Sequence, residues 1–252
     1  LPQTIKDAIL VTWKLGIRYL WVDALCIVQK AVFDSKNGIS IHDGEWAVEA
    51  NNMASVYGNA YITIMAASAA DCQDGFLKLS WISEKCRTPR ESNGGLSTYY
   101  LLLDVEFALH SSPLYGRGWA FQESVLSRRL LIFVKNEILW LCDYVFNRMT
   151  SEGWIDHTGY VSSLRSRHNN GLLTVRDWSK WAKDYSSRET SHASDRLAAL
   201  SGVIHHFAQE NNDTSVLGLW RSDIPLGLLW KPMGITPTAR IKRAEFFMPT
   251  WS

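Results

Sequence analysis

The stretch GRGWAFQESVLSRR places a carboxylate, an aromatic ring and several arginines within one predicted helix and its two ends. Trp119 and Glu123 are four residues apart, so a helix puts them on the same face. Arg117 and Gly118 stand at the predicted helix N-terminus, where anions are favoured and glycine permits close approach of the backbone. Arg128 follows the helix. A carboxylate beside an aromatic wall, with arginines at hand, could hold a nucleotide. The alternative is an ordinary amphipathic helix in which Glu123 pairs with Arg117.

A second candidate is Asp23, which interrupts the apolar run GIRYLWVDALCIVQ. A buried carboxylate without partners is costly, so it is normally hydrogen-bonded, paired or neutralised. If a strand ends near Val22, Asp23 lies at the rim where the carboxyl ends of parallel strands form a ligand crevice. One interpretation makes Asp23 a cap for the following loop or the partner of an arginine. The other makes it a ligand-facing acid.

The pattern of apolar residues predicts the helices and strands that must position these residues. Together they predict a layered α/β fold. Apolar residues at helical spacing predict helices over residues 1–16 and 45–60, and Asp7 on the first of them is predicted to be solvated. Continuous apolar runs predict buried parallel strands within residues 19–28 and 61–68. Helix, strand, helix, strand with short connections is typical of α/β domains.

Further along the chain, the pattern predicts a strand over residues 97–107, a short helix over 116–127 and a β-hairpin over 129–142. Residues 174–187 and 194–210 are predicted to be helical. Residues 30–44, 71–97 and 143–170 are rich in polar residues and are predicted to be loops or irregular segments.

Composition excludes several classes of function. The net charge of +1 over 252 residues gives no electrostatic case for nucleic acid, and no apolar run reaches the roughly 18 residues of a membrane span. The four cysteines form no C-x-x-C pair and no zinc spacing, so we expect no metal site and a reducing compartment. Cys26 and Cys142 lie in apolar runs and are predicted to be buried. Twelve tryptophans predict many interlocked aromatic contacts or a partner surface.

Several long motifs carry a family resemblance. LPQTIKDAILVTWKLGIRYLWVDALCIVQ, EWAVEANNMASVYGNAYITIMAASAAD, PLYGRGWAFQESVLSRRLLIF and ILWLC resemble, in order and spacing, the fungal heterokaryon-incompatibility (HET) domain over roughly residues 1–142. The helical tail resembles the segment that often follows such a domain.

The resemblance implies a cytoplasmic domain of fungal non-self recognition and cell-death signalling, acting through self-association or a protein partner. HET domains have been likened to TIR domains, which implies a flavodoxin-like, mostly parallel sheet flanked by helices. Some TIR domains cleave NAD with the glutamate of a W-x-x-x-E motif, a spacing that Trp119 and Glu123 match. The alternative function is therefore an NAD glycohydrolase with Glu123 as catalytic residue and Asp23 nearby.

The same resemblance sets the expected domain boundaries. We expect a HET-like α/β domain over residues 1–145, without the strand that usually precedes it in the family, and a mainly helical extension over residues 146–252 that is cut short at its end. The acidic residue that the family usually has before the last cysteine is Leu141 in this chain.

Overall fold

The structure is a computed structural model that describes residues 1–27, 41–78, 84–89, 96–101, 105–143, 145–150, 153–156, 173–192 and 195–229. Its elements in chain order are α1 (Gln3–Lys14), α2 (Asp23–Cys26), α3 (Ile41–Asn59), β1 (Thr63–Met65), β2 (Glu84–Pro89), β3 (Leu96–Leu101), α4 (Val105–His110), the 3₁₀ helix η1 (Pro113–Gly116), α5 (Gly118–Leu126), β4 (Arg129–Val134), β5 (Glu137–Cys142), β6 (Phe146–Thr150), β7 (Gly153–Asp156), α6 (Val175–Ser186), α7 (Asp195–Asn211), β8 (Ser215–Val216), β9 (Leu219–Trp220), the 3₁₀ helix η2 (Arg221–Asp223) and α8 (Ile224–Gly227).

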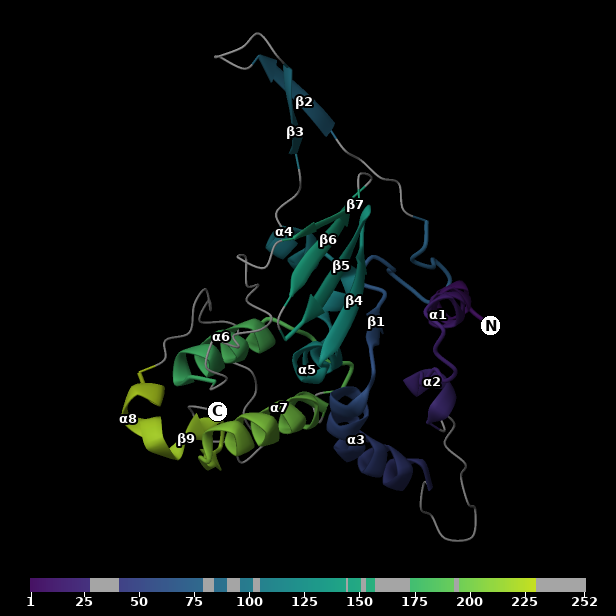
Figure 1. The fold of residues 1–252 in the computed structure, drawn as a ribbon. Helices are drawn as coiled ribbons and strands as arrows, with labels where there is room; N and C mark the ends of the chain where they lie inside the picture. Colours follow the sequence, from purple (N-terminus) through teal and green to yellow (C-terminus); the bar gives the residue numbers. More distant parts are fainter. Residues whose placement is uncertain are drawn as a thin grey trace, which may run out of the picture.

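A five-stranded sheet of order β1-β4-β5-β6-β7 forms the centre of the fold (Figure 1). The predicted α/β class and the 129–142 hairpin are confirmed, and Asn136 takes the positive φ of 71° that its turn requires. The expectation of a mostly parallel sheet is wrong: only β1 and β4 pair in parallel, and the other three pairs are antiparallel. No more than three residues separate successive strands from β4 to β7, and so short a link can join only antiparallel neighbours.

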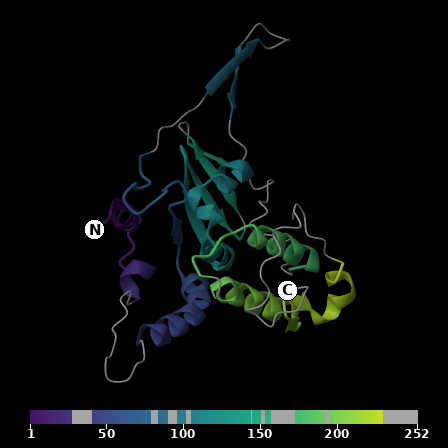
Figure 2. The same ribbon diagram turned by 180° about the vertical axis from the view of Figure 1, so that it is seen from behind.

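One hydrophobic core lies between the sheet and the segment from α4 to η1. Seen from behind, α4 and α5 lie against one face of the sheet (Figure 2). Leu109 of α4 is buried against the strands, and Tyr115 of η1 packs on the edge of the same cluster. The sheet contributes its buried apolar residues Met65, Leu130, Ile132, Val134, Leu139, Leu141 and Phe146.

A second core joins α5 to the helical extension. Trp178 of α6, Phe207 of α7 and Trp220 of β9 meet there, with ring centroids of Trp178 and Trp220 5.0 Å apart and those of Phe207 and Trp220 4.4 Å apart. Phe121 and Val125 of α5 are buried in the same cluster. The predicted helices of the extension and the predicted interlocking aromatic contacts are confirmed.

The strand predicted within residues 19–28 is absent from the described part of the chain. Residues 17–22 form no ladder, Tyr19 is 82% exposed, and Asp23 begins the one-turn helix α2. A strand exists only where a neighbour satisfies its backbone groups, and none of the strands in the described residues lies beside this segment. Cys26, predicted to be buried, is exposed for the same reason, while Cys142 is partly buried.

Three other expectations are corrected. Residues 146–150 and 153–156 form β6 and β7 inside the segment predicted to be irregular. The strand predicted over residues 97–107 ends at Leu101, and α4 begins at Val105. Strands β2 and β3 form a hairpin that projects from the body of the fold, partly within the predicted 71–97 loop (Figure 1). Most of the loop predicted for residues 30–44 lies outside the described residues.

Asp7 is an anchor rather than a solvated surface residue. Only 7% exposed, its carboxylate accepts hydrogen bonds from the backbone N–H groups of Phe76 (2.8 Å) and Leu77 (3.2 Å) and from Nε2 of Gln3 (2.7 Å). Burial alone would raise the pKa of Asp7, but these hydrogen bonds outweigh it and hold the pKa below its ordinary value. Asp7 therefore ties α1 to the loop that follows β1.

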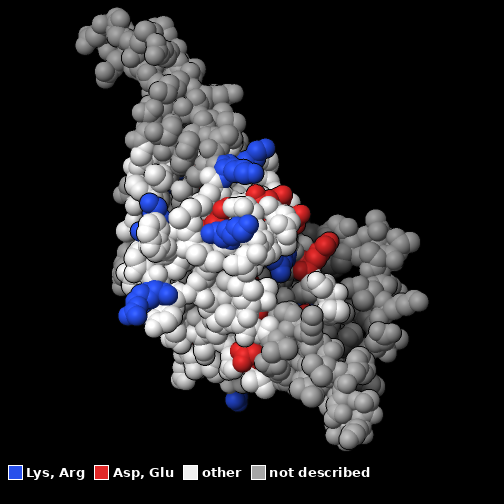
Figure 3. Space-filling model, turned by 90° about the vertical axis from the view of Figure 1, so that its right-hand side faces the viewer, with Lys and Arg blue, Asp and Glu red and all other residues white. Residues whose placement is uncertain are grey.

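The face of the molecule with α1 and α2 shows basic and acidic side chains interspersed on a larger uncharged surface (Figure 3). This mixture agrees with the small net charge of the chain. No helix among the described residues is long and apolar enough to cross a membrane.

Candidate functional site

Helix α5 holds Glu123 at a junction of the sheet and the helices. Ala120, Phe121 and Val125 are buried on its inner faces, and α5 contacts both α3 and α7. At its C-terminal end, Ser127 Oγ donates to the backbone carbonyl of Glu123 (2.6 Å) and lies 2.7 Å from Oγ1 of Thr63. This ties the turn that carries Glu123 to β1.

Three side chains meet around the Glu123 carboxyl. Tyr57 of α3 forms a hydrogen bond with it, and the charges of Asp23 at the start of α2 and Arg117 before α5 act on it. We call Asp23, Tyr57, Arg117 and Glu123 the Glu123 site. Asp23, Arg117 and Glu123 were all predicted site residues, and the structure brings these three together.

The Glu123 carboxyl has an unusual pKa. Part of the residue keeps contact with solvent, but the surrounding protein desolvates the carboxyl. Burial, and then the negative charge of Asp23, raise its pKa to about 7 against the opposing effects of Arg117 and Tyr57. Near neutral pH the carboxyl is thus divided between its acid and its carboxylate forms. That is the condition in which one side chain can serve as a general acid, a general base or a stabilising charge.

Tyr57 is the member of the site that sequence analysis did not select. Burial, followed by the charges of Glu123 and Asp23, raises the pKa of its phenol, which therefore stays protonated and donates to Glu123. The edge-on ring of Trp21 packs against it with centroids 5.9 Å apart. A signal existed: Tyr57 shares the inner stripe of its helix with apolar residues, and a buried hydroxyl needs a partner.

Asp23 makes a local hydrogen bond, and its charge also acts on the Glu123 carboxyl. Its Oδ1 accepts a hydrogen bond from the N–H of Ala24 (2.7 Å), which orients the carboxylate within the first turn of α2. Its charge also raises the pKa values of Glu123 and Tyr57. Because Trp21 packs on Tyr57, the short segment that ends at Asp23 lies over α3 beside the site.

A comparison with protein families shows that the Glu123 site lies within a stretch that matches a known family. Residues 1–123 match the model of the family described as heterokaryon incompatibility protein (HET). This part of the chain is a HET domain. All four members of the Glu123 site lie within the matched residues, and the last of these is Glu123 itself. The match gives the protein a role related to heterokaryon incompatibility. No match was found among curated proteins or among solved structures.

Two other predicted ligand residues of the HET domain face the helical extension. The indole N–H of Trp119 donates to Asp195 Oδ2 of α7 at 3.4 Å. The N–H of Gly118 donates to the carbonyl of Glu189 (2.7 Å), and a Cβ on Gly118 would lie 2.6 Å from Cγ2 of Thr190. Glycine is thus required at position 118 because Thr190 packs too close to leave room for a Cβ. Its N–H is occupied and not directed at a ligand.

The two arginines flank α5 at opposite ends. Arg117 is exposed at the N-terminus, where its guanidinium stays accessible to an anion. Arg128 is exposed beyond the C-terminal end. Arg117 belongs to the Glu123 site because its charge acts on the Glu123 carboxyl, whereas Arg128 is not among the groups whose charges shift the pKa of that carboxyl. Among the described residues there is no group of three or more His, Cys, Asp or Glu side chains that could hold a metal ion.

Proposed function

We propose that this HET domain acts in the cytoplasm in fungal non-self recognition and cell-death signalling, and that its output is cleavage of NAD at the Glu123 site. The observation that carries the proposal is the Glu123 carboxyl, desolvated and poised near neutral pH beside a second carboxylate and an accessible arginine. Strongly shifted carboxyl groups that share a site with charged partners are typical of catalytic centres. The W-x-x-x-E spacing of Trp119 and Glu123 supports the same chemistry.

The reaction would be hydrolysis of the bond between nicotinamide and ribose. The C1′–N bond breaks, both of its electrons leave with nicotinamide as a neutral base, and positive charge develops at C1′. Water then adds to C1′, which gives ADP-ribose and releases one proton. The carboxylate form of Glu123 would stabilise the developing cation and accept the proton of the water, as carboxylates do in glycoside cleavage.

The other residues have supporting roles in this proposal. Arg117 would hold the pyrophosphate through charge-assisted hydrogen bonds. Asp23 would accept a hydrogen bond from a ribose hydroxyl. Tyr57 would hold the carboxylate of Glu123 in place. Trp119 is given no ligand contact, because its indole is engaged by Asp195.

Nicotinamide release from NAD by the purified chain tests the proposal. Glu123→Gln keeps the shape of the side chain and removes its charge, and should lower the rate by about 100-fold or more. Glu210→Gln, at an exposed acid on α7, is the matched control and should leave the rate unchanged. Release at the wild-type rate by Glu123→Gln would overturn the assignment.

A second candidate output is self-association or partner binding without catalysis. The N-terminal segment favours it, because α1 and the residues after it expose several large apolar side chains: Ile9, Leu10, Trp13, Tyr19 and Leu25. This candidate predicts that Glu123→Gln still triggers cell death and that the chain assembles with rising concentration in sedimentation velocity. A monomer that kills only when Glu123 is intact would exclude it.

A further inference from the structure

We propose that Arg188, which lies outside the residues matched by the HET family, is a positioning residue that holds Arg117 beside Glu123. The inference rests on the proposed function of the Glu123 site. In this inference the helical extension maintains the geometry of the Glu123 site, although all four members of the site come from residues 1–123.

The backbone around Arg117 is held by the segment that follows α6. The N–H of Glu189 donates to the carbonyl of Gly116 (2.7 Å), and the N–H of Gly118 donates to the carbonyl of Glu189 (2.7 Å). These two bonds form a parallel bridge between Arg117 and Glu189. Nη1 of Arg188 adds a longer bond to the carbonyl of Arg117 (3.5 Å). The backbone of Arg117 therefore cannot move without breaking contacts to the extension.

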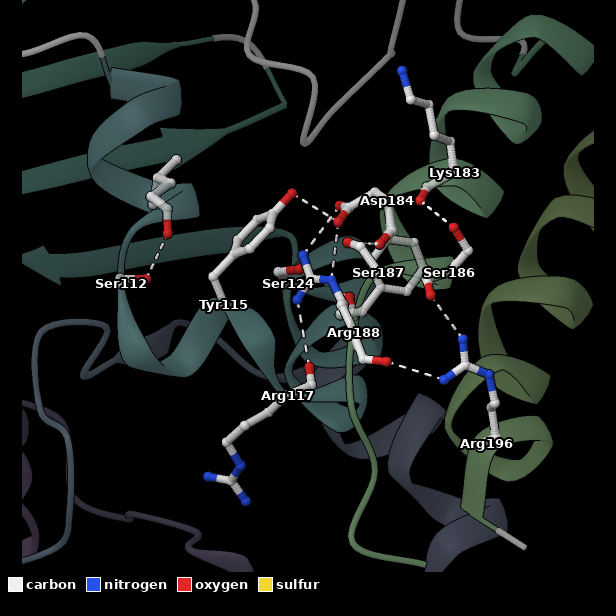
Figure 4. Close-up of polar contacts among 12 residues, drawn as sticks. Ser112, Tyr115, Arg117, Ser124, Lys183, Asp184, Ser186, Ser187, Arg188 and Arg196 are labelled. Carbon is white, nitrogen blue, oxygen red and sulfur yellow. Dashed lines mark hydrogen bonds and ion pairs between the residues drawn. The ribbon is translucent and has the colours of Figure 1, made fainter. Parts of the chain in front are cut away.

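Arg188 is itself fixed on several sides. It is only 3% exposed, and its Nε and Nη2 donate to the two carboxylate oxygens of Asp184, each at 3.1 Å. The hydroxyl of Tyr115 donates to the same carboxylate (2.7 Å), and the guanidinium lies 4.0 Å from the ring centroid of Tyr115. A buried, bidentate and stacked arginine has little freedom. We call Tyr115, Asp184, Arg188 and Arg196 the Arg188 network (Figure 4).

Arg196 of α7 closes the network from the other side. Its guanidinium donates to the backbone carbonyls of Arg188 (3.0 Å) and Ser186 (2.9 Å), which fixes the end of α6. Figure 4 shows the carbonyl of Arg117 directed at Arg188, while its own side chain points away from the network. Arg117 thus connects the Arg188 network to the Glu123 site. Its backbone carbonyl contacts the network, and its side chain belongs to the site.

The position of Arg117 affects the ionisation of Glu123 through the positive charge of its guanidinium. The groups that face its carboxyl are Asp23 from α2, Tyr57 from α3 and Arg117 from the start of α5. Arg117 is the cation among them and favours the carboxylate form. If the Arg188 network is weakened, the segment that holds the backbone of Arg117 is less well fixed and the guanidinium of Arg117 moves away from Glu123. The carboxylate then loses part of its counter-charge, and Glu123 becomes protonated at a higher pH.

The test uses the full chain with Arg188→Lys, which keeps the charge and loses the bidentate pair, and Tyr115→Phe, which removes one hydrogen bond to Asp184. Arg176→Lys, at an exposed arginine of α6, is the matched control. The readouts are the pH titration of the ¹³C-labelled Glu123 carboxyl by NMR, assigned with Glu123→Gln, and the rate of nicotinamide release. Melting temperature reports whether each variant is folded.

We expect Arg188→Lys to move the midpoint of the Glu123 titration upward by about one pH unit, and Tyr115→Phe to move it less. The rate of nicotinamide release at pH 7 should then fall roughly fivefold, because the ionised fraction falls from a half to a tenth. An unchanged titration in a folded variant overturns the inference. If the wild type releases no nicotinamide, the proposed reaction fails, and the carboxyl titration alone decides whether Arg188 positions Arg117.

Discussion

The hydroxyl of Tyr57 donates a hydrogen bond to the carboxyl of Glu123 and thereby connects α3 to α5 at the centre of the site. This bond opposes the effect of burial. Desolvation favours the neutral acid, whereas a donated hydrogen bond favours the carboxylate. Tyr57 therefore helps to keep Glu123 poised near neutrality when burial alone would hold it protonated.

Replacement of Tyr57 by phenylalanine should raise the pKa of Glu123 from about 7 toward about 8. The pH profile of kcat/KM for NAD cleavage should move in the same direction, with roughly a fivefold loss at pH 7. Tyr61→Phe is the matched control, since Tyr61 is 70% exposed. A profile that does not move in Tyr57→Phe would show that the hydroxyl has no influence on the ionisation of Glu123.

Replacement of Glu123 by glutamine should stabilise the protein at alkaline pH. Burial and the charge of Asp23 raise the folded-state pKa of Glu123 from 4.5 to about 7, so between these values the folded state binds more protons than the unfolded state. The contribution of Glu123 to the free energy of unfolding is fully present below pH 4.5 and is lost as the pH rises through about 7. Chemical denaturation should find Glu123→Gln more stable than wild type at pH 8 by about 1–3 kcal/mol, with little gain at pH 4.

The control for this comparison is Glu210→Gln. Its free energy of unfolding relative to wild type should not increase between pH 4 and pH 8. A Glu123→Gln protein that is less stable than wild type at pH 8 would mean that the carboxylate makes favourable contacts that outweigh its desolvation.

The local pattern of the sequence predicted α5, the 129–142 hairpin and the helices of the extension, because each has a clear period or turn residue. It missed β6, where the inward-facing positions are Phe146 and Arg148. Arg148 is 2% exposed and paired with Glu137, so a charged residue occupies a place where alternation predicts an apolar one. A buried ion pair of this kind hides the pattern of a strand.

The site was predicted in part for a similar reason. Spacing within one segment indicated that Arg117 and Glu123 lie close together, and the apolar run around Asp23 marked that carboxylate as unusual. Nothing local showed that Tyr57 would face Glu123, because that contact depends on how α3 packs against α5. The contacts of Gly118 and Trp119 with the extension were likewise set by tertiary packing.

A matched pair of glycines tests the contact between α5 and the extension. A Cβ at residue 118 would lie 2.6 Å from Thr190 Cγ2 and 3.2 Å from the carbonyl of Glu189, whereas a Cβ at residue 116 meets nothing within 4 Å. Gly118→Ala should therefore lower the free energy of unfolding by about 1–3 kcal/mol, and Gly116→Ala should leave it nearly unchanged. Thermal or chemical denaturation measures both.

Partial rescue of Gly118→Ala by Thr190→Ser would identify the clash, since serine lacks the methyl group that the new Cβ meets. Equal stability of Gly118→Ala and Gly116→Ala would contradict the close approach of the extension to α5.

Asp7 should be needed for stability at neutral pH and less so in acid. Its pKa is held below the ordinary value by the N–H groups of Phe76 and Leu77 and by Gln3, against the effect of burial. The stabilisation is therefore present above the unfolded-state pKa of 3.8 and is lost as pH falls through the lower folded-state value. Asp7→Asn keeps the shape of the side chain but presents one acceptor oxygen where two are used, so we expect a loss of about 1–3 kcal/mol at pH 7. Urea denaturation at pH 7 and pH 3 should show this loss shrink in acid, and a loss of equal size at both pH values would assign the effect to packing and not to the carboxylate.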